Sequence, residues 1–442
     1  MILRDPVHGL VAFEEDAERV VMALLATREV QRMRRVRQLG LTALVFPGAE
    51  HSRFAHALGA AHVMTRLLAR ARARQDELPP EQRLDAASAR EAVAAALLHD
   101  LGHGPFSHLF EDVLPDARSH ESWTMEVLRD PSTDVHRALE GLEAGMADRV
   151  ADLLAGAHRL AWLCPTLSGT LDVDRCDYLL RDSHMTGVAY GRYDLDWLLR
   201  ALAFAHVDEA HGGGESGTWV LAIEGRKGLP PFEAYFLARH YMYQQVYHHK
   251  ATRAAECLIR AMFVRLAELV REGAPPPQTP SAVRAAVLGE RLALGEYLDL
   301  DDPLLMHCFA DWERAGDPLL ASFAARLRHR RLPKTIPLPD SPEEAPRWRD
   351  VLARAEDVAR RRGLRPELSV WLDVPTDVPY EEPRGASPDG LWVTLSRPPI
   401  RRLGELSFLL RQLRNETIVR PRLAFLPELR EEVEAAVDGV LR

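Results

Sequence analysis

The stretch AAALLHDLGHGPFSH, residues 94–108, constrains the fold and the chemistry of this chain more than any other segment. Its Ala and Leu residues are typical of a buried helix, since both have high helix propensity and no polar group. His99 and Asp100 end the helix, and two glycines and a proline then turn the chain. A core helix gains nothing from His99, His103, His108 and Asp100 so close together. The cluster therefore indicates a binding site.

A metal ion is the simplest ligand for His99 and Asp100. Neighbouring side chains on a helix point about 100° apart, so both reach one ion only where the backbone turns. An imidazole nitrogen and a carboxylate oxygen suit Mn, Fe, Zn or Mg with open positions. A lone His-Asp pair is usually structural, so further ligands are required. The candidates are His56, at a predicted helix start, and the acidic residues of LDVDRCDYLLRD: Asp172, Asp174 and Asp177.

The next residues could transfer protons or bind an anion. His103 and His108 lie in one loop, and Glu111 follows His108 by three residues. A carboxylate at this spacing can orient an imidazole and raise its pKa, as a general acid needs. His120 begins the next predicted helix. Four cationic residues stand beside these motifs: Arg53, Arg175, Arg239 and Lys250.

Composition excludes several classes of protein. The net charge of −9 argues against a general nucleic-acid or anionic-membrane binder. No apolar run approaches the roughly 20 residues needed to span a bilayer, and the N-terminus lacks the apolar segment of a signal peptide. The four cysteines are scattered without a CxxC pair, so we expect reduced thiols and no zinc-thiolate site. These features predict a soluble cytoplasmic protein.

The pattern along the chain predicts a mainly α fold. Helical spacing covers residues 17–45, 53–74 and 88–99, and an aromatic-rich helix is expected over 229–271. The proline-rich EGAPPPQTPSA is the clearest linker. We therefore expect a helical catalytic core over residues 1–272 and a smaller helical or α+β C-terminal region over 282–442.

The order H…HD…D resembles the HD-domain phosphohydrolase superfamily. The flanking motifs RDPVHG, QRMRRVRQLG, VFPGAEHSRFAHALG, LLHDLGHGPFSHLFE, LDVDRCDYLLRDS and ARHYMYQQVYHHK follow in the order of its deoxynucleoside triphosphate triphosphohydrolases. These include the sterile-alpha-motif/HD protein and its bacterial relatives. The resemblance covers about residues 1–265 and, less sharply, residues 290–335.

The resemblance implies a reaction and a catalytic set. Water activated by a divalent metal (Mn, Mg, Fe, Zn or Ni) would attack the α-phosphorus and release deoxynucleoside and inorganic triphosphate. The implied metal ligands are His56, His99, Asp100 and Asp174. His108, paired with Glu111, would protonate the leaving 5′-oxygen. His103 and His120 would support the α-phosphate and this proton relay.

The resemblance also implies a substrate-binding set. Its phosphate-binding members are Arg53, Arg175, Arg239 and Lys250. Gln38 and Asp182 would bind the sugar 3′-hydroxyl, and Leu39 would pack on the base. Tyr178 and Tyr247 would crowd the 2′ position and so favour deoxyribose, because an aromatic ring is a wall that rejects a 2′-hydroxyl.

Regulation and two alternative functions remain open from the sequence. The resemblance implies a homo-oligomer, a dimer or tetramer, and a possible nucleotide activator. However, Ala26 stands where the family has the Asp that reads a regulatory guanine. One alternative is an HD phosphohydrolase for a monophosphate or signalling nucleotide, for which Arg239 and Lys250 would be superfluous. The other is a non-catalytic nucleotide sensor, which would not need the His108–Glu111 pair.

Overall fold

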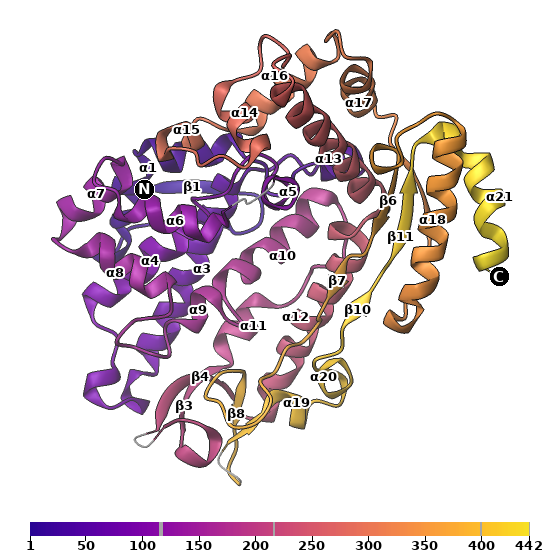
Figure 1. Ribbon diagram of the computed structural model, residues 1–442. Coiled ribbons are helices and arrows are strands. Elements are labelled where there is room, and N and C mark those ends of the chain that lie inside the picture. Colours follow the sequence, from indigo (N-terminus) through magenta and orange to yellow (C-terminus); the bar gives the residue numbers. More distant parts are fainter. Residues whose placement is uncertain (115–117, 215–216, 398–399, 442) are drawn as a thin grey trace.

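A computed structural model describes residues 1–114, 118–214, 217–397 and 400–441 (Figure 1). The described chain is mainly helical with small sheets of two to four strands, which confirms the expected fold class. Among the described residues, none of the helices combines the length and apolar composition that crossing a bilayer requires. The four cysteines are free.

Three helices form the centre of the N-terminal part of the chain. α4 (Ala86–Leu98) begins at Asp85, whose side chain accepts a hydrogen bond from the backbone of Ser88, and its last eight residues are all buried. α4 packs on α3 (Arg53–Ala73), and α10 (Val173–Thr186) also packs on α3. The alanine side chains of α4 permit close helix packing. This packing brings the end of α4 into the interior, beside the first turns of α3 and α10.

The aromatic-rich segment differs from the single helix expected over residues 229–271. α12 (Leu229–Met242) continues into one π-helical turn (Tyr243–Tyr247), and α13 (Lys250–Arg271) then starts separately. The break comes from His249, which has an extended backbone and caps α13 by accepting a hydrogen bond from the backbone of Ala251. Single π-turns inside helices are frequent at functional sites.

The N-terminal and C-terminal parts of the chain share one sheet. β3 (Leu202–Val207) and β4 (Thr218–Glu224) form an antiparallel pair. β4 then pairs in parallel with β8 (Trp392–Thr394), which pairs with β9 (Ile400–Arg402). A strand from residues 282–442 therefore extends a sheet that begins in residues 1–272.

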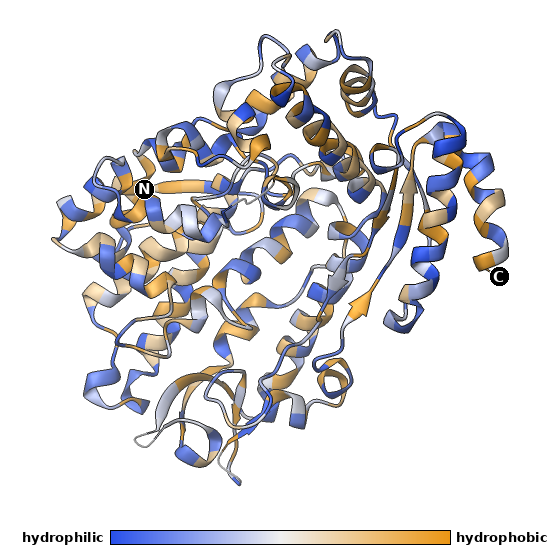
Figure 2. Cartoon of the chain, in the orientation of Figure 1, coloured by the Kyte–Doolittle hydropathy of each residue, from blue (hydrophilic) through white to orange (hydrophobic). Residues whose placement is uncertain are grey.

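A second core lies at the C-terminal end of the chain. β11 (Arg422–Phe425) lies between β5 (Lys334–Pro337) and β6 (Val370–Asp373). α18 (Ala345–Arg361) and α21 (Arg430–Leu441) pack together beside this sheet (Figure 1). Figure 2 shows that much of α18 is hydrophilic, and its buried residues recur at helical spacing: Trp348, Val351, Ala355, Val358 and Ala359. One face of α18 therefore completes this smaller core.

Arg32 connects three distant parts of the chain. It ends α2 (Arg28–Arg32) and is buried. Its Nε and Nη2 donate hydrogen bonds to the carbonyl oxygen of Leu300 at 3.1 and 2.7 Å, and its Nη1 donates to that of His103 at 2.8 Å. The guanidinium therefore holds the loop after α4 against residues of the C-terminal part.

Replacing Arg32 by Met should lower the free energy of unfolding by about 3 kcal/mol, because buried carbonyl groups lose their donors. Urea denaturation followed by circular dichroism would measure this change. Arg28→Met is the matched control, since Arg28 forms only an exposed ion pair with Asp299, at 2.9 Å. It should change the free energy by about 0.5 kcal/mol or less. Equal effects of the two substitutions would contradict the proposed importance of Arg32.

Candidate functional site

Four polar side chains from three helices meet in the core. His56 comes from α3, Asp174 from α10, and His99 and Asp100 from the end of α4. His56 Nε2 lies 3.3 Å from His99 Nε2 and 3.0 Å from Asp174 Oδ1, which is 3.4 Å from His99 Nε2. The Asp100 oxygens are 3.6 Å from His56 Nε2 and 3.5 Å from His99 Nε2. Ligand atoms at ~2.1 Å from one metal ion lie about 3.0–3.5 Å apart, so these atoms have the spacing of a metal site.

The hydrogen bonds of the two imidazoles test whether a cation fits. His56 Nδ1 lies 2.8 Å from Asp177 Oδ2, and His99 Nδ1 lies 2.9 Å from the carbonyl oxygen of Ala96. Both acceptors require a proton on Nδ1, so in each neutral ring Nε2 carries the lone pair. The two Nε2 atoms face each other across 3.3 Å, with carboxylates beside them. A proton or a metal ion can lie among these atoms, and two imidazole nitrogens with two carboxylates are ligand types that suit a divalent metal.

Electrostatics also favour positive charge at this point. Burial alone would lower the pKa of His56, but hydrogen bonds and charge from Asp174 and Asp177 raise its pKa to about 10. Burial would raise the pKa of Asp174, whereas His56 and His99 hold it below its usual range. The surroundings therefore keep the carboxylate ionised and stabilise a cation beside it.

The structure separates the three aspartates that the sequence left as alternatives. Asp174 faces His56 and His99. Asp172 caps α10, since its Oδ1 accepts a hydrogen bond from the backbone of Arg175 at 2.7 Å. Asp177 lies one helical turn further along and contacts the far side of the His56 ring. One motif thus supplies a candidate ligand, a helix cap and a partner for another candidate ligand.

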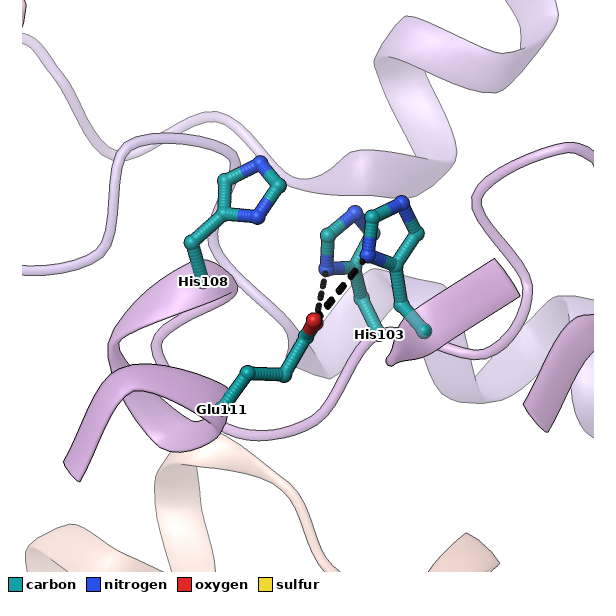
Figure 3. Close-up of side chains that lie close together, drawn as sticks. His103, His108 and Glu111 are labelled. Carbon is teal, nitrogen blue, oxygen red and sulfur yellow. Dashed lines mark hydrogen bonds and ion pairs between the residues drawn. The ribbon is translucent and has the colours of Figure 1, made fainter. Parts of the chain in front are cut away.

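The second cluster contains His103, His108, Glu111 and His120 (Figure 3). Glu111 Oε1 lies 3.1 Å from His120 Nδ1 and 3.5 Å from His103 Nδ1. The sequence predicts that Glu111 pairs with His108, but Figure 3 draws no contact between Glu111 and His108. The reason is that the Glu111 carboxylate points from α5 (His108–Val113) to the loop and to α6 (His120–Arg129), where two ring nitrogens meet it.

The pKa of His108 also differs from the expectation. Burial, Arg53 and His120 lower the pKa of His108, and Glu111 offsets this only in part. Burial and the charge of Arg53 lower the pKa of His103 to about 3. In this structure both rings are therefore neutral near pH 7.

The second cluster has metal-binding residue types but poor metal geometry. Its candidate ligand atoms all lie within 4.8 Å of one another. However, the rings of His103 and His120 are stacked, with centroids 3.8 Å apart and planes 12° apart. Parallel rings direct their lone pairs side by side, so an ion ~2.1 Å from both nitrogens would lie far outside both ring planes. This geometry favours proton transfer or anion binding over metal binding.

A cavity of about 460 Å³ connects the two clusters. It is lined by Asp100, Asp174, His103, His108 and His120 and by these expected substrate-binding residues: Gln38, Leu39, Arg53, Arg175, Tyr178, Asp182 and Tyr247. Arg53 is buried at its base, where it donates hydrogen bonds to Asp100 and, at 2.8 Å, to Ser107 Oγ. The cavity thus combines acidic, imidazole and guanidinium groups.

Two expected phosphate-binding residues lie outside this cavity. Arg239 lines an adjoining cavity of about 760 Å³, which Arg175 also lines, and forms an ion pair with Asp377 at 2.9 Å. Lys250 lines a separate cavity of about 340 Å³ together with Lys334. The helix ends before His249 and a new helix, α13, begins at Lys250. In α13, Thr252 and Arg253 line the 460 Å³ cavity, whereas Lys250 does not.

The sequence reasoning did not include His51 and did not predict that Asp182 contacts both His51 and Tyr247. His51 Nε2 lies 2.7 Å from Asp182 Oδ1, and the Tyr247 hydroxyl donates to Asp182 Oδ2 at 2.8 Å. Gln38 Oε1 is buried and has no hydrogen-bond partner among the residues that the structure describes. His51 stands in the motif VFPGAEHSRF, so a signal was present, but no local pattern links it to residue 182. The orphaned amide oxygen marks a place for a donor from a ligand.

Comparison with known proteins agrees with this geometry. The HD domain family model matches residues 53–182, which contain both clusters. The uncharacterized protein YwfO of Bacillus subtilis is 31% identical over 380 residues, covering 86% of this chain and 81% of the relative. The chain belongs to the HD-domain phosphohydrolases. Its cluster of His56, His99 and Asp174 has the residue types and spacing to hold a divalent metal.

More distant relatives include one with a named activity. The deoxynucleoside triphosphate triphosphohydrolase SAMHD1 of Danio rerio is 28% identical over 295 residues, covering 60% of this chain but only 44% of the relative. The crystal structure of a phosphohydrolase from Bacteroides thetaiotaomicron has a TM-score of 0.78 at 24% identity, with 96% of this chain and 99% of that chain covered. A hypothetical protein from Aquifex aeolicus has a TM-score of 0.72 at 24% identity, with 99% of each chain covered. These two structures share the fold.

Replacing Asp174 by Ala should remove bound metal, because one of the convergent ligand atoms is lost. His108→Ala should retain it, since His108 belongs to the other cluster. Metal content per chain, measured by atomic emission after dialysis against Mn²⁺, checks both. Asp172→Asn is the control, because it lies two residues away and Asn still caps a helix. Retention of metal by Asp174→Ala, or loss from His108→Ala, would contradict this assignment.

Proposed function

We propose that this protein is a metal-dependent deoxynucleoside triphosphate triphosphohydrolase, which releases deoxynucleoside and inorganic triphosphate. The observation that carries the proposal is the 460 Å³ cavity, whose lining combines Asp100 and Asp174 of the His/Asp cluster, the three imidazoles of the second cluster and Gln38, whose buried Oε1 has no hydrogen-bond partner among the described residues. The name of the SAMHD1 relative supports the same reaction. A net-acidic protein needs such a local cationic pocket to bind about four phosphate charges.

The ligands of the metal would be His56, His99, Asp100 and Asp174. A bound divalent metal supplies a water of lowered pKa and polarises a phosphoryl oxygen. Arg53 contacts Asp100 and lines the cavity, so it can bind the oxygens of the phosphate under attack. Arg175 lines both this cavity and the 760 Å³ cavity, which places it to bind phosphates further along the chain.

His108 is the proposed donor of the proton that the leaving 5′-oxygen requires. Its side chain is exposed to the cavity, whereas His103 is buried. Arg53 contributes to its lowered pKa, so phosphate oxygens that neutralise Arg53 would raise the pKa of His108 again. His108 would thus be charged mainly when substrate is bound. Glu111 orients His103 and His120, whose rings lie 4.8 and 5.2 Å from that of His108.

The far wall of the cavity suits a deoxyribose. Gln38 Oε1 can accept a hydrogen bond from the sugar 3′-hydroxyl. Tyr178 and Tyr247 meet edge to face with centroids 6.0 Å apart, and the bond to Asp182 fixes the Tyr247 ring. A fixed ring leaves no space for a 2′-hydroxyl and offers it no hydrogen-bond partner.

One observation favours a second candidate, an HD phosphohydrolase for a nucleotide with fewer phosphates. The arginines that line the 460 Å³ cavity are Arg53, Arg175 and Arg253, and Arg253 already forms ion pairs with Asp373 and Glu256. Arg239 and Lys250 were expected to argue against a monophosphate, but they lie outside this cavity. The nature of the phosphate product distinguishes the two candidates.

With Mn²⁺ and each of the four deoxynucleoside triphosphates, the protein should release deoxynucleoside and inorganic triphosphate in equal amounts. Ion-exchange chromatography of the products, with and without a second nucleotide, checks this. Asp174→Ala and addition of a chelator are the controls, and both should stop the reaction. Orthophosphate as the product would support the second candidate. Tight binding of nucleotide without turnover would support a sensor.

Tyr247→Ala should raise kcat/KM for ribonucleoside triphosphates, relative to deoxynucleotides, by about tenfold or more, because the wall at the 2′ position is removed. Steady-state kinetics with paired ribo- and deoxynucleotides measures this ratio. Tyr247→Phe keeps the ring and loses only the bond to Asp182, so it should keep most of the discrimination. An unchanged ratio in Tyr247→Ala would rule out the wall.

A further inference from the structure

The N-terminal motif RDPVHG has no place in the cavity, yet the structure buries part of it. β1 (Ile2–Asp5) and β2 (Gly9–Ala12) form an antiparallel hairpin. Asp5 Oδ1 accepts hydrogen bonds from the backbone of Val7 and of His8, both at 2.9 Å, which fixes the turn between the strands. The His8 side chain is only 4% exposed although it lies in a two-stranded hairpin at the end of the chain.

His8 is connected to a proposed metal ligand through one carboxylate. His8 Nε2 lies 2.6 Å from Asp177 Oδ1, and Asp177 Oδ2 lies 2.8 Å from His56 Nδ1. The side chains of Asp177 and His56 are fully buried. A continuous line of hydrogen bonds therefore runs from the hairpin to the ring whose Nε2 faces His99 and Asp174.

Arg181 completes the surroundings of Asp177. Its Nε and Nη2 donate to the two Asp177 oxygens at 2.8 and 2.9 Å, and its Nη1 donates to Asp5 Oδ2 at 2.8 Å. With His8 and His56, Asp177 thus accepts four hydrogen bonds, about the full capacity of a carboxylate. Gly59 leaves the required room, because a methyl group there would overlap Asp177 Oδ1 and Arg181 Nη2.

We infer that Asp177 and His8 are positioning residues of the metal centre. Asp177 keeps the Nδ1 proton on His56, so that the Nε2 lone pair points to the metal, and His8 holds the second oxygen of Asp177 in place. Hydrogen-bond partners of this kind orient ligating imidazoles and make them more basic. The inference rests on the proposed role of His56 as a ligand. It makes the hairpin, far from the HD motif in sequence, part of the metal centre.

A matched pair of variants tests the role of His8 in the full-length chain. His8→Leu removes the donor to Asp177, whereas His8→Gln retains an N–H donor on a side chain of similar reach. Arg4→Ala, on the exposed face of the same hairpin, is the control. The readouts are the dissociation constant of Co²⁺, from competition with a chelator, the visible absorption of bound Co²⁺, and the melting temperature of the metal-free protein.

We expect His8→Leu to raise the Co²⁺ dissociation constant about 10- to 100-fold and to change the Co²⁺ spectrum. His8→Gln should recover most of the affinity, and Arg4→Ala should match the wild type. Asp177→Asn should weaken binding as well. If Asp177→Asn fails to fold because Arg181 loses its partner, the His8 pair still decides the question.

Two outcomes would overturn the inference, and they differ from failure of the proposed function. If His8→Leu keeps the Co²⁺ affinity and spectrum of the wild type, the hydrogen bonds of His8 have only a structural role, even if the melting temperature falls. This result would leave the proposed reaction unaffected. Absence of Co²⁺ binding by the wild type would overturn both the metal-dependent function and the positioning role. If metal binding depends on His8 but the protein releases no triphosphate, the inference is supported and the proposed deoxynucleoside triphosphate substrate is contradicted.

Discussion

The close approach of two buried imidazole nitrogens organises this site. His56 and His99 each donate a hydrogen bond from Nδ1 to an oxygen, so their Nε2 atoms face each other at 3.3 Å with Asp100 and Asp174 alongside. The neighbouring carboxylates stabilise positive charge at this point. The packing of α3, α4 and α10 holds these atoms together. The 460 Å³ cavity, the second imidazole cluster and the N-terminal hairpin all contact these residues or their neighbours.

The sequence could predict the parts of the site that depend on local signals. An Ala/Leu helix that ends on His99 and Asp100 before a Gly/Pro turn fixes both the helix and the place where two polar side chains can converge. Cap-forming and acidic residues around Asp174 likewise predict a helix start. The mainly α fold follows from the same helical spacing, and the structure confirms it.

The partners of individual side chains could not be predicted in this way. Spacing shows that Glu111 can reach His108, but not that His103 and His120 compete for the same carboxylate from other elements. The apolar pattern of residues 229–271 is continuous, so it does not reveal that His249 leaves the helical conformation and turns Lys250 away from the cavity. Asp177 was visible as an acidic residue, but its partner His8 lies 169 residues away in the sequence.

Because Arg32 binds residues that are far apart in the sequence, the site can form completely only after most of the chain has been synthesised. Its guanidinium holds the carbonyl of His103 with one nitrogen, and two others bind the carbonyl of Leu300. On the ribosome, the residues of both histidine clusters emerge long before Leu300 does. Until then the guanidinium lacks two of its hydrogen bonds, so the loop that carries His103 and His108 is less firmly held. We therefore expect a nascent chain to assemble its ligands early and to become a competent catalyst only late in translation.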